Sequence, residues 1–559
     1  MITFSQDPDV AERQMQAVIF YLTTFGYIDG DFDGSEKDYV RNYIRTLVEQ
    51  RVRNGIPDAT ADLQKELVDR FTVHFHEVFE NIDREVQDLF TESVSSEDSQ
   101  EAFIHTRLKL RCFELFQSFD RGNQEKLLEA MDSLIAADGQ VHPAEQKFRN
   151  ELVSLFESDL GIEIVADDSK PRLSVAESVT KPAPASSHPF FDQFEHHYSS
   201  DHDKIAKQVA ADLTLVDSTL AALGRDRAIG NGKLRGVQTV ESFAGGTPFL
   251  DGHTWVHPIT PSTKYELLVL GDLHGCYSCL KGSIMQTAFF DRVAAYKADP
   301  TLPKPILVLL GDYIDRGLFS LNGVLRTVLQ LYVSAPEHVY VLRGNHEYYV
   351  EHKGQIYGGV KPAEAINTLK PHLPIEVFRR YMTLFNELPN VLLFGDMMFV
   401  HAGIPRDRAL KEKWVDLSTL NDADLRFQMM WSDPSSADVI PASLQEQSAR
   451  FPFGRLQATA FLQRIGCHTL VRGHEKVNDG FVRNYDDENI TLCTLFSAGG
   501  DNNDLPPDSS YRTVTPKALT IHIGPDGIRM EPFEIDYRTY NDPEYNAFFA
   551  APMEIEHRT

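Results

Sequence analysis

Five short apolar runs in the second half of the chain each end in a cluster of polar residues. The runs read YELLVL, ILVLL, HVYVL, MMFV and HTLV, and they lead into GDLHG (271–275), GDYIDRG (311–317), RGNHE (343–347), HAG (401–403) and RGH (472–474). Nearly continuous apolar strands are typical of a sheet that is covered on both faces. In α/β sheets, functional side chains collect beyond the carboxyl ends of the strands. The pattern therefore predicts an α/β fold in which the five clusters meet at one edge.

The clusters contain the donors that hard and borderline divalent cations prefer, which are oxygen and nitrogen atoms without any thiolate. Carboxylates would hold two cations close together, while neutral imidazoles and an amide would complete the coordination without excess negative charge. Two cations about 3.5–4 Å apart can lower the pKa of a bridging water and hold a tetrahedral phosphate. The predicted ligands are Asp272, His274, Asp312, Asn345, His401 and His474.

Composition excludes several classes of protein. The net charge of −28 argues against a nucleic-acid partner, because such binding depends on cationic contacts to phosphates. Five scattered cysteines do not form a disulfide framework in a chain of 559 residues. The first residues lack a targeting pattern, and no run of about 18 apolar residues follows. We expect a cytoplasmic protein with reduced thiols and no membrane span.

Patterning and composition also divide the chain into domains. Residues 1–164 are acidic and show helical spacing of apolar residues, so we expect an all-α domain. Residues 165–189 are rich in Ser, Pro and Ala, as linkers are. A helical or irregular connector at 190–261 then leads to an α/β catalytic domain at 262–530 and a C-terminal extension at 531–559. The connector carries His196, His197 and His202 beside two aspartates, which we interpret as a polar helix start rather than a metal site.

The N-terminal part contains an internal duplication. YIDGDFDGSEKDYVRNYI (27–44) aligns with AADGQVHPAEQKFRNELV (136–153), pairing Asp29 with Asp138 and Gly30 with Gly139. The sequence argues against an EF-hand calcium loop, because its twelfth position is Val40 instead of a bidentate glutamate. The paired acidic loops resemble the tellurite-resistance TerB-like helical domain. That resemblance implies a stress-linked accessory domain that binds metal or a protein partner; a plain helical bundle with capped helices is the alternative.

The five clusters, in their order, resemble the phosphoprotein phosphatase (serine/threonine phosphatase) branch of the calcineurin-like metallophosphoesterases. FNELP (385–389), WSDP (431–434) and FG (453–454) support the resemblance, which spans roughly residues 262–525. It implies an αββα sandwich, so the predicted fold is multidomain, with an all-α N-terminal domain and an α/β catalytic domain. It also implies a dinuclear centre holding manganese, iron or zinc. Asp272 and His274 would hold the first metal, Asp312 would bridge both, and Asn345, His401 and His474 would hold the second.

The resemblance further implies roles in catalysis. His346 would act as a general acid oriented by Asp315, while a metal-bridging hydroxide attacks phosphorus. Arg316 would bind the substrate phosphate together with Asn345. A second phosphate-binding arginine is expected before FG, and Arg450 is the candidate, with Arg455 as its competitor.

The chain also departs from the family pattern. Ala402 stands where a glycine is usual, and FSAGGDNND (496–504) lacks the proline–asparagine–tyrosine turn that follows FSA in many protein phosphatases. The CxxC at 276–279 has no second pair, so we interpret its cysteines as ordinary thiols. We interpret Arg343, Glu347 and Arg472 as salt-bridge partners.

The prediction is a metal-dependent phosphomonoesterase, with phosphorylated protein as the first choice of substrate. One alternative keeps the chemistry and changes the substrate to a nucleotide or a dinucleoside polyphosphate. An alternative of another class is a stress-linked scaffold whose phosphatase half is inactive, although every ligand position holds a suitable residue.

Overall fold

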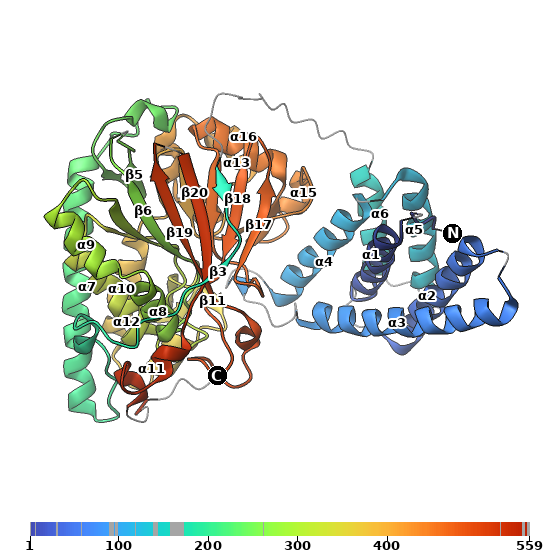
Figure 1. Ribbon diagram of the computed structural model, residues 1–559, viewed down its shortest axis with the longest axis horizontal. Helices are drawn as coiled ribbons and strands as arrows, with labels where there is room; N and C mark the ends of the chain where they lie inside the picture. The colour runs from blue at the N-terminus through green and yellow to red at the C-terminus, as the bar shows by residue number, and fades with distance from the viewer. Residues whose placement is uncertain are drawn as a thin grey trace. The chain divides into compact units, whose positions relative to one another are not determined.

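The chain forms two compact units. The helical unit comprises Met1–Val94, Asp98–Gly161 and Ser435–Pro452, and the α/β unit comprises Ser95–Glu97, Ile162–Pro434 and Phe453–Thr559. Figure 1 shows the ribbon of the computed structural model. The structure describes residues 2–5, 7–28, 32–57, 59–88, 94–95, 99–117, 119–137, 143–156, 173–260, 262–525, 527–550 and 554–555.

The helical unit is a bundle with its own apolar core, as the helical spacing predicted. The core includes Phe25, Leu47, Phe79 and Phe113, each contributed by a different helix. Helix α2 begins with a capping box, in which the Asp33 carboxylate accepts the Glu36 N–H. The acidic-loop residues Asp29–Asp31 and Asp138–Gly139 lie outside the described residues. The helices are α1 (Pro8–Gly26), α2 (Gly34–Gly55), α3 (Ala61–Asp88), α4 (Gln100–Gln117), α5 (Arg121–Ile135), α6 (Pro143–Phe156) and α15 (Ala442–Gln445), and a boundary between the units falls within β1 (Val94–Ser95).

Two sheets form the α/β unit (Figure 1). The first has the spatial order β17 (Phe481–Asp486), β18 (Thr491–Leu495), β16 (Thr469–Arg472), β13 (Met397–Val400), β12 (Val391–Phe394), β5 (Thr254–His257) and β4 (Phe249–Asp251). The second has the order β2 (Ser174–Val175), β20 (Gly527–Glu534), β19 (Lys517–Gly524), β6 (Tyr265–Leu270), β7 (Lys304–Leu309) and β8 (Val339–Val341), with β3 (Val179–Thr180) also paired to β20.

Alternating side chains show how the sheets are covered. In β12, Leu392 and Phe394 join the large apolar core that contains strands of both sheets, while Val391 and Leu393 join a second core with residues of α13, α14 and α16. Successive side chains of a strand point to opposite faces, so one face of the first sheet meets the other sheet and the opposite face meets helices. The predicted αββα sandwich is confirmed.

The remaining elements surround the sheets. The helices are α7 (His202–Gly230), α8 (Tyr277–Gln286), α9 (Phe289–Ala298), α10 (Arg326–Ser334), α11 (Glu364–Leu369), α12 (Ile375–Glu387), α13 (Asp407–Lys413), α14 (Ala423–Gln428) and α16 (Arg455–Ile465). Among the short strands, β9 (Tyr349–His352) pairs with β10 (Gln355–Gly358), and the others are β11 (Val360–Lys361), β14 (Ser432–Pro434) and β15 (Phe451–Phe453).

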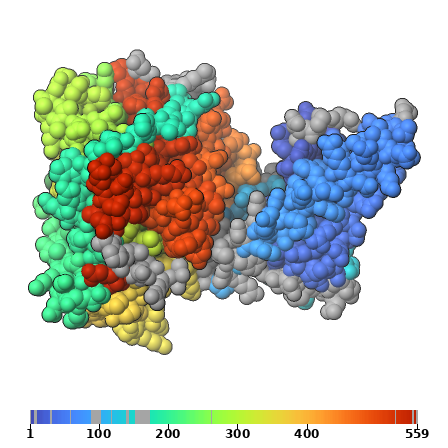
Figure 2. Space-filling view, turned by 60° about the horizontal axis from the view of Figure 1, so that its bottom comes forward, coloured from blue at the N-terminus to red at the C-terminus, as the bar shows by residue number. Residues whose placement is uncertain are grey.

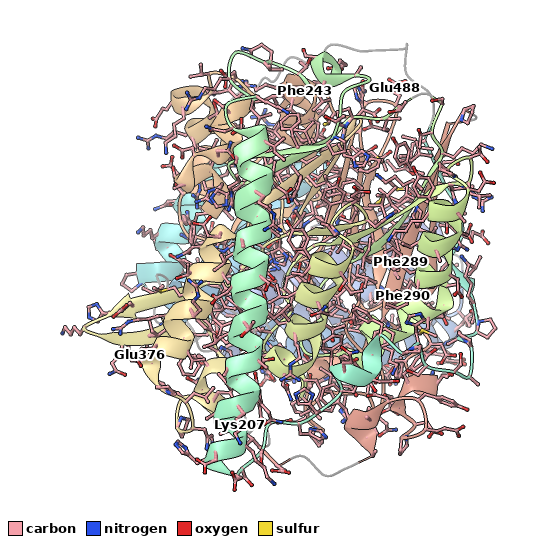
Figure 3. All side chains as sticks on the ribbon, turned by 90° about the vertical axis from the view of Figure 1, so that its left-hand side faces the viewer. Lys207, Phe243, Phe289, Phe290, Glu376 and Glu488 are labelled. Carbon is pink, nitrogen blue, oxygen red and sulfur yellow. The ribbon has the colours of Figure 1, made fainter. Side chains whose placement is uncertain are left out.

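Residues outside the predicted catalytic domain contribute to this unit. Part of the segment expected to be a linker adds β2 and β3 to β20, because an open sheet edge offers unpaired backbone groups. Figure 2 shows residues near 180, in teal, beside the C-terminal strands, in red. The expected connector supplies β4, β5 and the long helix α7, which Figure 3 shows along the unit with Lys207 toward one end. From the expected C-terminal extension, Phe548 enters the main core.

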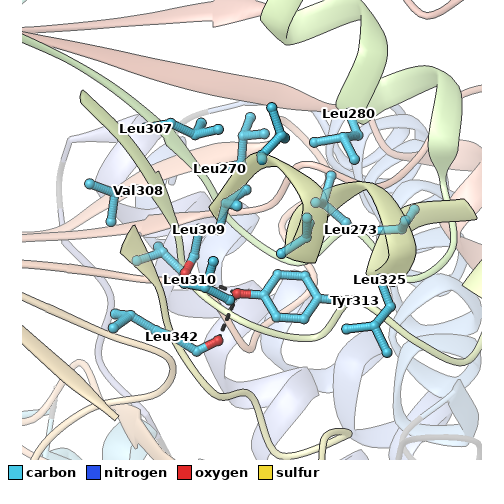
Figure 4. Packing of buried hydrophobic residues seen from close by; sticks show 14 of the residues in the cluster. Leu270, Leu273, Leu280, Leu307, Val308, Leu309, Leu310, Tyr313, Leu325 and Leu342 are labelled. Atoms are coloured by element: carbon cyan, nitrogen blue, oxygen red, sulfur yellow. Dashed lines mark hydrogen bonds between the residues drawn. The ribbon is translucent and has the colours of Figure 1, made fainter. Parts of the chain in front are cut away.

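The strands that lead to the polar clusters run side by side. β6, β7 and β8 are parallel neighbours, so their carboxyl ends share one edge. Residues 306–310 are fully buried, as expected for a strand covered on both faces. The Tyr313 hydroxyl donates to the carbonyls of Leu309 (3.1 Å) and Leu342 (2.6 Å), which ties the ends of β7 and β8 together (Figure 4).

The two sheets also meet at this edge. Asp272, two residues after the end of β6, forms an isolated parallel bridge with Phe496, directly after β18. The Gly271 N–H donates to the Ser497 hydroxyl at 2.9 Å. Since β13, β16 and β18 are parallel neighbours, their carboxyl ends bring HAG and RGH to the same place as GDLHG. The tertiary structure therefore gathers all five clusters.

Candidate metal centre

The first group of ligand atoms surrounds the His274 imidazole. Its Nε2 lies 3.6 Å from Asp272 Oδ2 and 3.5 Å from Asp312 Oδ2, and all three side chains are buried. Its Nδ1 lies 3.0 Å from the Ile314 carbonyl, which can only accept, so Nδ1 carries the proton. The Nε2 lone pair therefore faces the two carboxylates, the orientation that a metal-ligating histidine takes.

The second group surrounds Asn345. Its Oδ1 lies 2.8 Å from His401 Nε2 and 3.0 Å from His474 Nδ1, and His401 Nε2 lies 3.3 Å from Asp312 Oδ1. His401 Nδ1 lies 3.1 Å from the Leu310 carbonyl, which again directs the Nε2 lone pair into the site. Asp312 thus contributes one carboxylate oxygen to each group, as a bridging ligand would.

These residues fit a pair of cations. Asn345 Oδ1 and His401 Nε2 both accept hydrogen bonds, so their contact is unfavourable without a partner between them. A shared cation would relieve it. Rotating the amide would also do so, because its nitrogen would then donate to His401 and Asp312. Among the described residues, buried Asp272 Oδ2 has no hydrogen-bond partner. Burial, followed by the nearby Asp312 carboxylate, raises the pKa of Asp272 to about 7. Two groups of side chains have ligand atoms close enough together to hold a metal ion. One comprises His274, Asp312 and His346, and the other comprises Asp312, His401 and His474.

Tight backbone turns aim these side chains. His274, Asp312 and His474 all have positive φ angles, of 42°, 55° and 74°. Such conformations are strained for residues with a Cβ and occur at functional sites where the surrounding structure enforces them. Gly344 allows the close approach of two clusters, since a Cβ there would lie 2.2 Å from the backbone nitrogen of Asp312.

Glu347 has a different role from the salt bridge that its sequence position suggested. Its carboxylate accepts the backbone N–H groups of Asp312 (2.8 Å), Tyr313 (2.8 Å) and Gly344 (3.0 Å). Burial, followed by the Asp312 charge, raises the pKa of Glu347 to about 8. The carboxylate therefore fastens GDYIDRG to RGNHE. Arg472 does form ion pairs, with Asp433 and Glu475, both at 2.8 Å.

The His346 imidazole lies between a carboxylate and the metal-competent groups. Its Nδ1 is 2.7 Å from Asp315 Oδ2, and its Nε2 is 3.9 Å from Asp312 Oδ2. The other Asp315 oxygen accepts the Ala365 N–H at 2.8 Å. This chain of contacts fixes the ring so that Nε2 faces the centre. Arg316 follows Asp315, and its guanidinium donates to Glu364 Oε1 at 2.6 Å.

The two arginine candidates before and after FG lie in different units. Arg450 belongs to the Ser435–Pro452 segment of the helical unit, and its guanidinium carbon lies 5.9 Å from the centre of the Phe103 ring. Arg455 begins α16 in the α/β unit and donates to Asp487 at 2.7 Å. Neither contact identifies the second phosphate-binding arginine, so that role stays a prediction.

Sequence reasoning missed Tyr511. Its ring lies 5.4 Å from the His274 ring and 5.2 Å from Phe496. Burial raises the pKa of Tyr511 to about 12, although the nearby Arg316 charge acts in the opposite direction. The surrounding SSYRT stretch carries no motif, and the only hint was that the preceding turn departs from the family pattern.

Two sequence interpretations concerned residues near the centre. Cys276 and Cys279 are buried free thiols, and the Asn503 amide lies 3.2 Å from Cys279 Sγ. In the connector, His197 Nε2 lies 2.8 Å from the Phe548 carbonyl, and burial lowers the pKa of His196 to about 4. The CxxC cysteines and the connector histidines thus contact other residues of the fold. Across the residues that the structure describes, no helix is long and apolar enough to cross a membrane.

Comparison with known proteins points to one family. Residues 265–478 match the model of the calcineurin-like phosphoesterase family. A probable serine/threonine-protein phosphatase of Encephalitozoon cuniculi is 26% identical over 257 residues, which are 45% of this chain and 51% of that protein. The chain thus covers about half the length of this relative.

Two solved structures are also similar. A serine/threonine phosphatase of Saccharomyces cerevisiae is 19% identical with a TM-score of 0.34, covering 59% of this chain and 89% of that one. A cold-active protein-tyrosine phosphatase of a psychrophilic Shewanella is 16% identical with a TM-score of 0.29, covering 50% and 82%. Residues 265–478 thus match a calcineurin-like phosphoesterase domain, and the chain is similar to a probable serine/threonine-protein phosphatase.

Proposed function

We propose that the α/β unit is a metal-dependent phosphomonoesterase that acts on phosphoserine or phosphothreonine in proteins. The observation that carries the proposal is the buried gathering of Asp272, His274, Asn345, His401 and His474 around Asp312. The intact ligand set also argues against an inactive scaffold. The printed name of the Encephalitozoon relative supports a protein substrate.

The proposal assigns two divalent cations to this centre, with manganese first and iron or zinc as alternatives. Asp272 and His274 would hold one, Asn345, His401 and His474 the other, and Asp312 both. When bound, the cations would supply an activated water at neutral pH and neutralise charge on the phosphate. The neutral state of the imidazoles suits this role, since burial lowers the pKa of His274 and of His401.

Side chains beside the centre would handle the leaving group and the phosphate. His346 would donate a proton from Nε2 to the departing serine or threonine oxygen. Asp315, 2.7 Å from Nδ1, would hold the ring in position and stabilise its protonated form. Arg316 would bind phosphate oxygens through its planar fork, assisted by Asn345 and by Arg450 or Arg455.

The substrate class is tested by comparing phosphopeptides with nucleotides and dinucleoside polyphosphates, each with added manganese. We expect kcat/KM for phosphoserine and phosphothreonine peptides to exceed that for nucleotides by at least about 10-fold, a difference in transition-state binding of roughly 1.4 kcal/mol. Phosphate release is the measurement, and Asp312→Asn protein gives the background. A preference for nucleotides would replace this proposal with a nucleotide hydrolase.

The proposal also covers location and partners. The five cysteines are free and buried, which supports a reducing, cytoplasmic setting. The helical unit would act as a TerB-like accessory domain that receives a protein partner or a metal, and its separate apolar core supports a separate role.

A further inference from the structure

The start of α11 contacts both side chains proposed to handle the substrate. The Ala365 N–H donates to Asp315 Oδ1 at 2.8 Å, and the adjacent Glu364 accepts from Arg316 Nη1 at 2.6 Å. The Pro362 carbonyl also accepts from Arg316 Nη1, at 3.2 Å. One short segment therefore reaches the acid's partner and the phosphate-binding arginine together.

Arg316 is a largely buried cation, and the Glu364 carboxylate is its paired charge. The Arg316 side chain is only 12% exposed, and Glu364 is 15% exposed. A buried guanidinium without a paired charge is costly, so the carboxylate stabilises the inward position of the side chain. Arg316 also has a strained backbone, with φ of 65°. Glu364 and the Pro362 carbonyl both accept from Nη1 and so hold the guanidinium.

We propose that Glu364 is a positioning residue that holds Arg316 ready to bind the substrate phosphate. The inference rests on the proposed phosphatase function. An arginine held in place binds the phosphate of substrate and transition state alike, so its loss should appear in KM and spare kcat.

The test compares Glu364→Gln with Glu376→Gln in the full chain. Glu376 is a 71% exposed carboxylate on α12, seen at the surface in Figure 3, and serves as the matched control. We expect Glu364→Gln to raise KM for p-nitrophenyl phosphate about 5- to 10-fold with kcat changed less than twofold. Inorganic phosphate, titrated with manganese present, should bind correspondingly weaker.

Unchanged phosphate affinity in Glu364→Gln would overturn the inference, as would a loss confined to kcat. Phosphate binding is measured by calorimetry without turnover, so it separates this inference from the proposed function. If the wild type binds phosphate but hydrolyses no ester, the function fails while the role of Glu364 is still decided.

A second observation concerns the Ser435–Pro452 segment. It leaves the α/β unit after WSDP and returns at FG, yet it belongs to the helical unit. Ala437, Ile440 and Leu444 are buried in the core of that unit. On α4, the Glu114 carboxylate accepts from the Ser435 hydroxyl at 2.5 Å and from the Ser436 N–H at 3.1 Å. The helical core is thus completed by residues from the middle of the phosphatase sequence.

The residues of the α/β unit that flank this segment in sequence contact clusters that carry candidate ligands. Asp433, two residues before Ser435, pairs with Arg472 at 2.8 Å and lies 3.9 Å from His474 Nε2. At the other end the Phe453 ring packs on Gly403, where an added Cβ would lie 2.3 Å from it. Gly403 belongs to the HAG cluster, which carries His401. The two flanking residues therefore contact the clusters that carry His401 and His474.

We infer that the helical unit regulates the metal centre through residues 435–452. Because the segment is covalently joined to Asp433 through Pro434, and to Phe453 directly, the state of the helical core biases the position of His401 and His474. Linkage is reciprocal, so metal binding should also stabilise the packing of the segment. The inference deepens the proposed function and depends on it for its effect on turnover.

The test is Glu114→Gln in the full chain, with Glu125→Gln as control because Glu125 is an exposed carboxylate on α5. We expect Glu114→Gln to change manganese affinity and kcat/KM for p-nitrophenyl phosphate by about 5-fold or more, the lower range of typical allosteric coupling. Leu444→Ala should have the same effect. Its control is Ser443→Ala, because Ser443 lies on the exposed side of α15.

Manganese titration by calorimetry reads the coupling even without turnover, so it separates this inference from the proposed function. Circular dichroism monitors the helices. Wild-type manganese affinity in both Glu114→Gln and Leu444→Ala would overturn the inference, whether or not the helical unit is destabilised.

Discussion

Replacing Asp312 with asparagine should reduce turnover by more than about 100-fold. A loss of about 100-fold is the upper end of what is typical when only a residue hydrogen-bonded to a metal ligand is changed, and Asp312 is itself proposed as a ligand. Asp312 offers one oxygen to each ligand group, 3.5 Å from His274 Nε2 and 3.3 Å from His401 Nε2. Asparagine keeps the size of the side chain but removes the negative charge that two adjacent cations require. Both sites should therefore lose affinity together, which metal analysis of the purified protein would show as less than one bound ion per chain.

Chelation tests the same centre without a mutation. Activity should disappear in excess chelator and return with manganese, because no nucleophile forms at neutral pH without the cations. Asp291→Asn, an exposed carboxylate on α9, provides the control and should match the wild type. Full turnover by protein shown to be metal-free would refute the dinuclear centre.

The second large effect is expected at His346 and depends on the leaving group. Serine and threonine alkoxides are strongly basic and need a proton as the P–O bond breaks, whereas nitrophenolate scarcely does. General acid catalysis contributes about 10²–10⁴-fold. His346→Asn should therefore slow hydrolysis of a phosphoserine peptide about 100-fold or more and affect p-nitrophenyl phosphate far less.

Asp315→Asn should show the same bias more weakly, because it releases the ring without removing it. The measurement is the ratio of kcat values on the two substrates, with metal content determined in parallel, since His346 Nε2 lies only 3.9 Å from Asp312. Equal losses on both substrates, with both metals retained, would mean that His346 positions phosphate or metal and does not donate the proton.

Local signals accounted for the α/β fold and for the gathering of the candidate ligands at strand ends. Each apolar run is a strand, and each polar cluster follows its strand directly, so short-range order placed Asp272, Asp312 and Asn345 at strand ends. The parallel pairing of β6, β7 and β8 then made convergence a geometric consequence. Each apolar run and the polar cluster after it lie within a few residues of one another, so both can be recognised from the sequence.

Contacts between distant segments were beyond such reasoning. The segment expected to be a linker adds strands to β20, and Ser435 meets Glu114 across 321 positions of sequence. Neither pairing leaves a periodic signal, because edge-strand addition uses backbone groups that every residue carries. The assignment of these two segments to their units was therefore decided by packing and not by composition.

The sequence by itself determined the strands, the clusters at their ends and the candidate ligands, because those features depend on neighbouring residues. Only the tertiary structure decided that Asp315 and Arg316 are held from α11, that Glu347 fastens two clusters together, and that residues 435–452 complete the helical core. Each of these depends on burial and on side chains meeting across long stretches of chain, and such encounters are selected by the packing of the whole molecule.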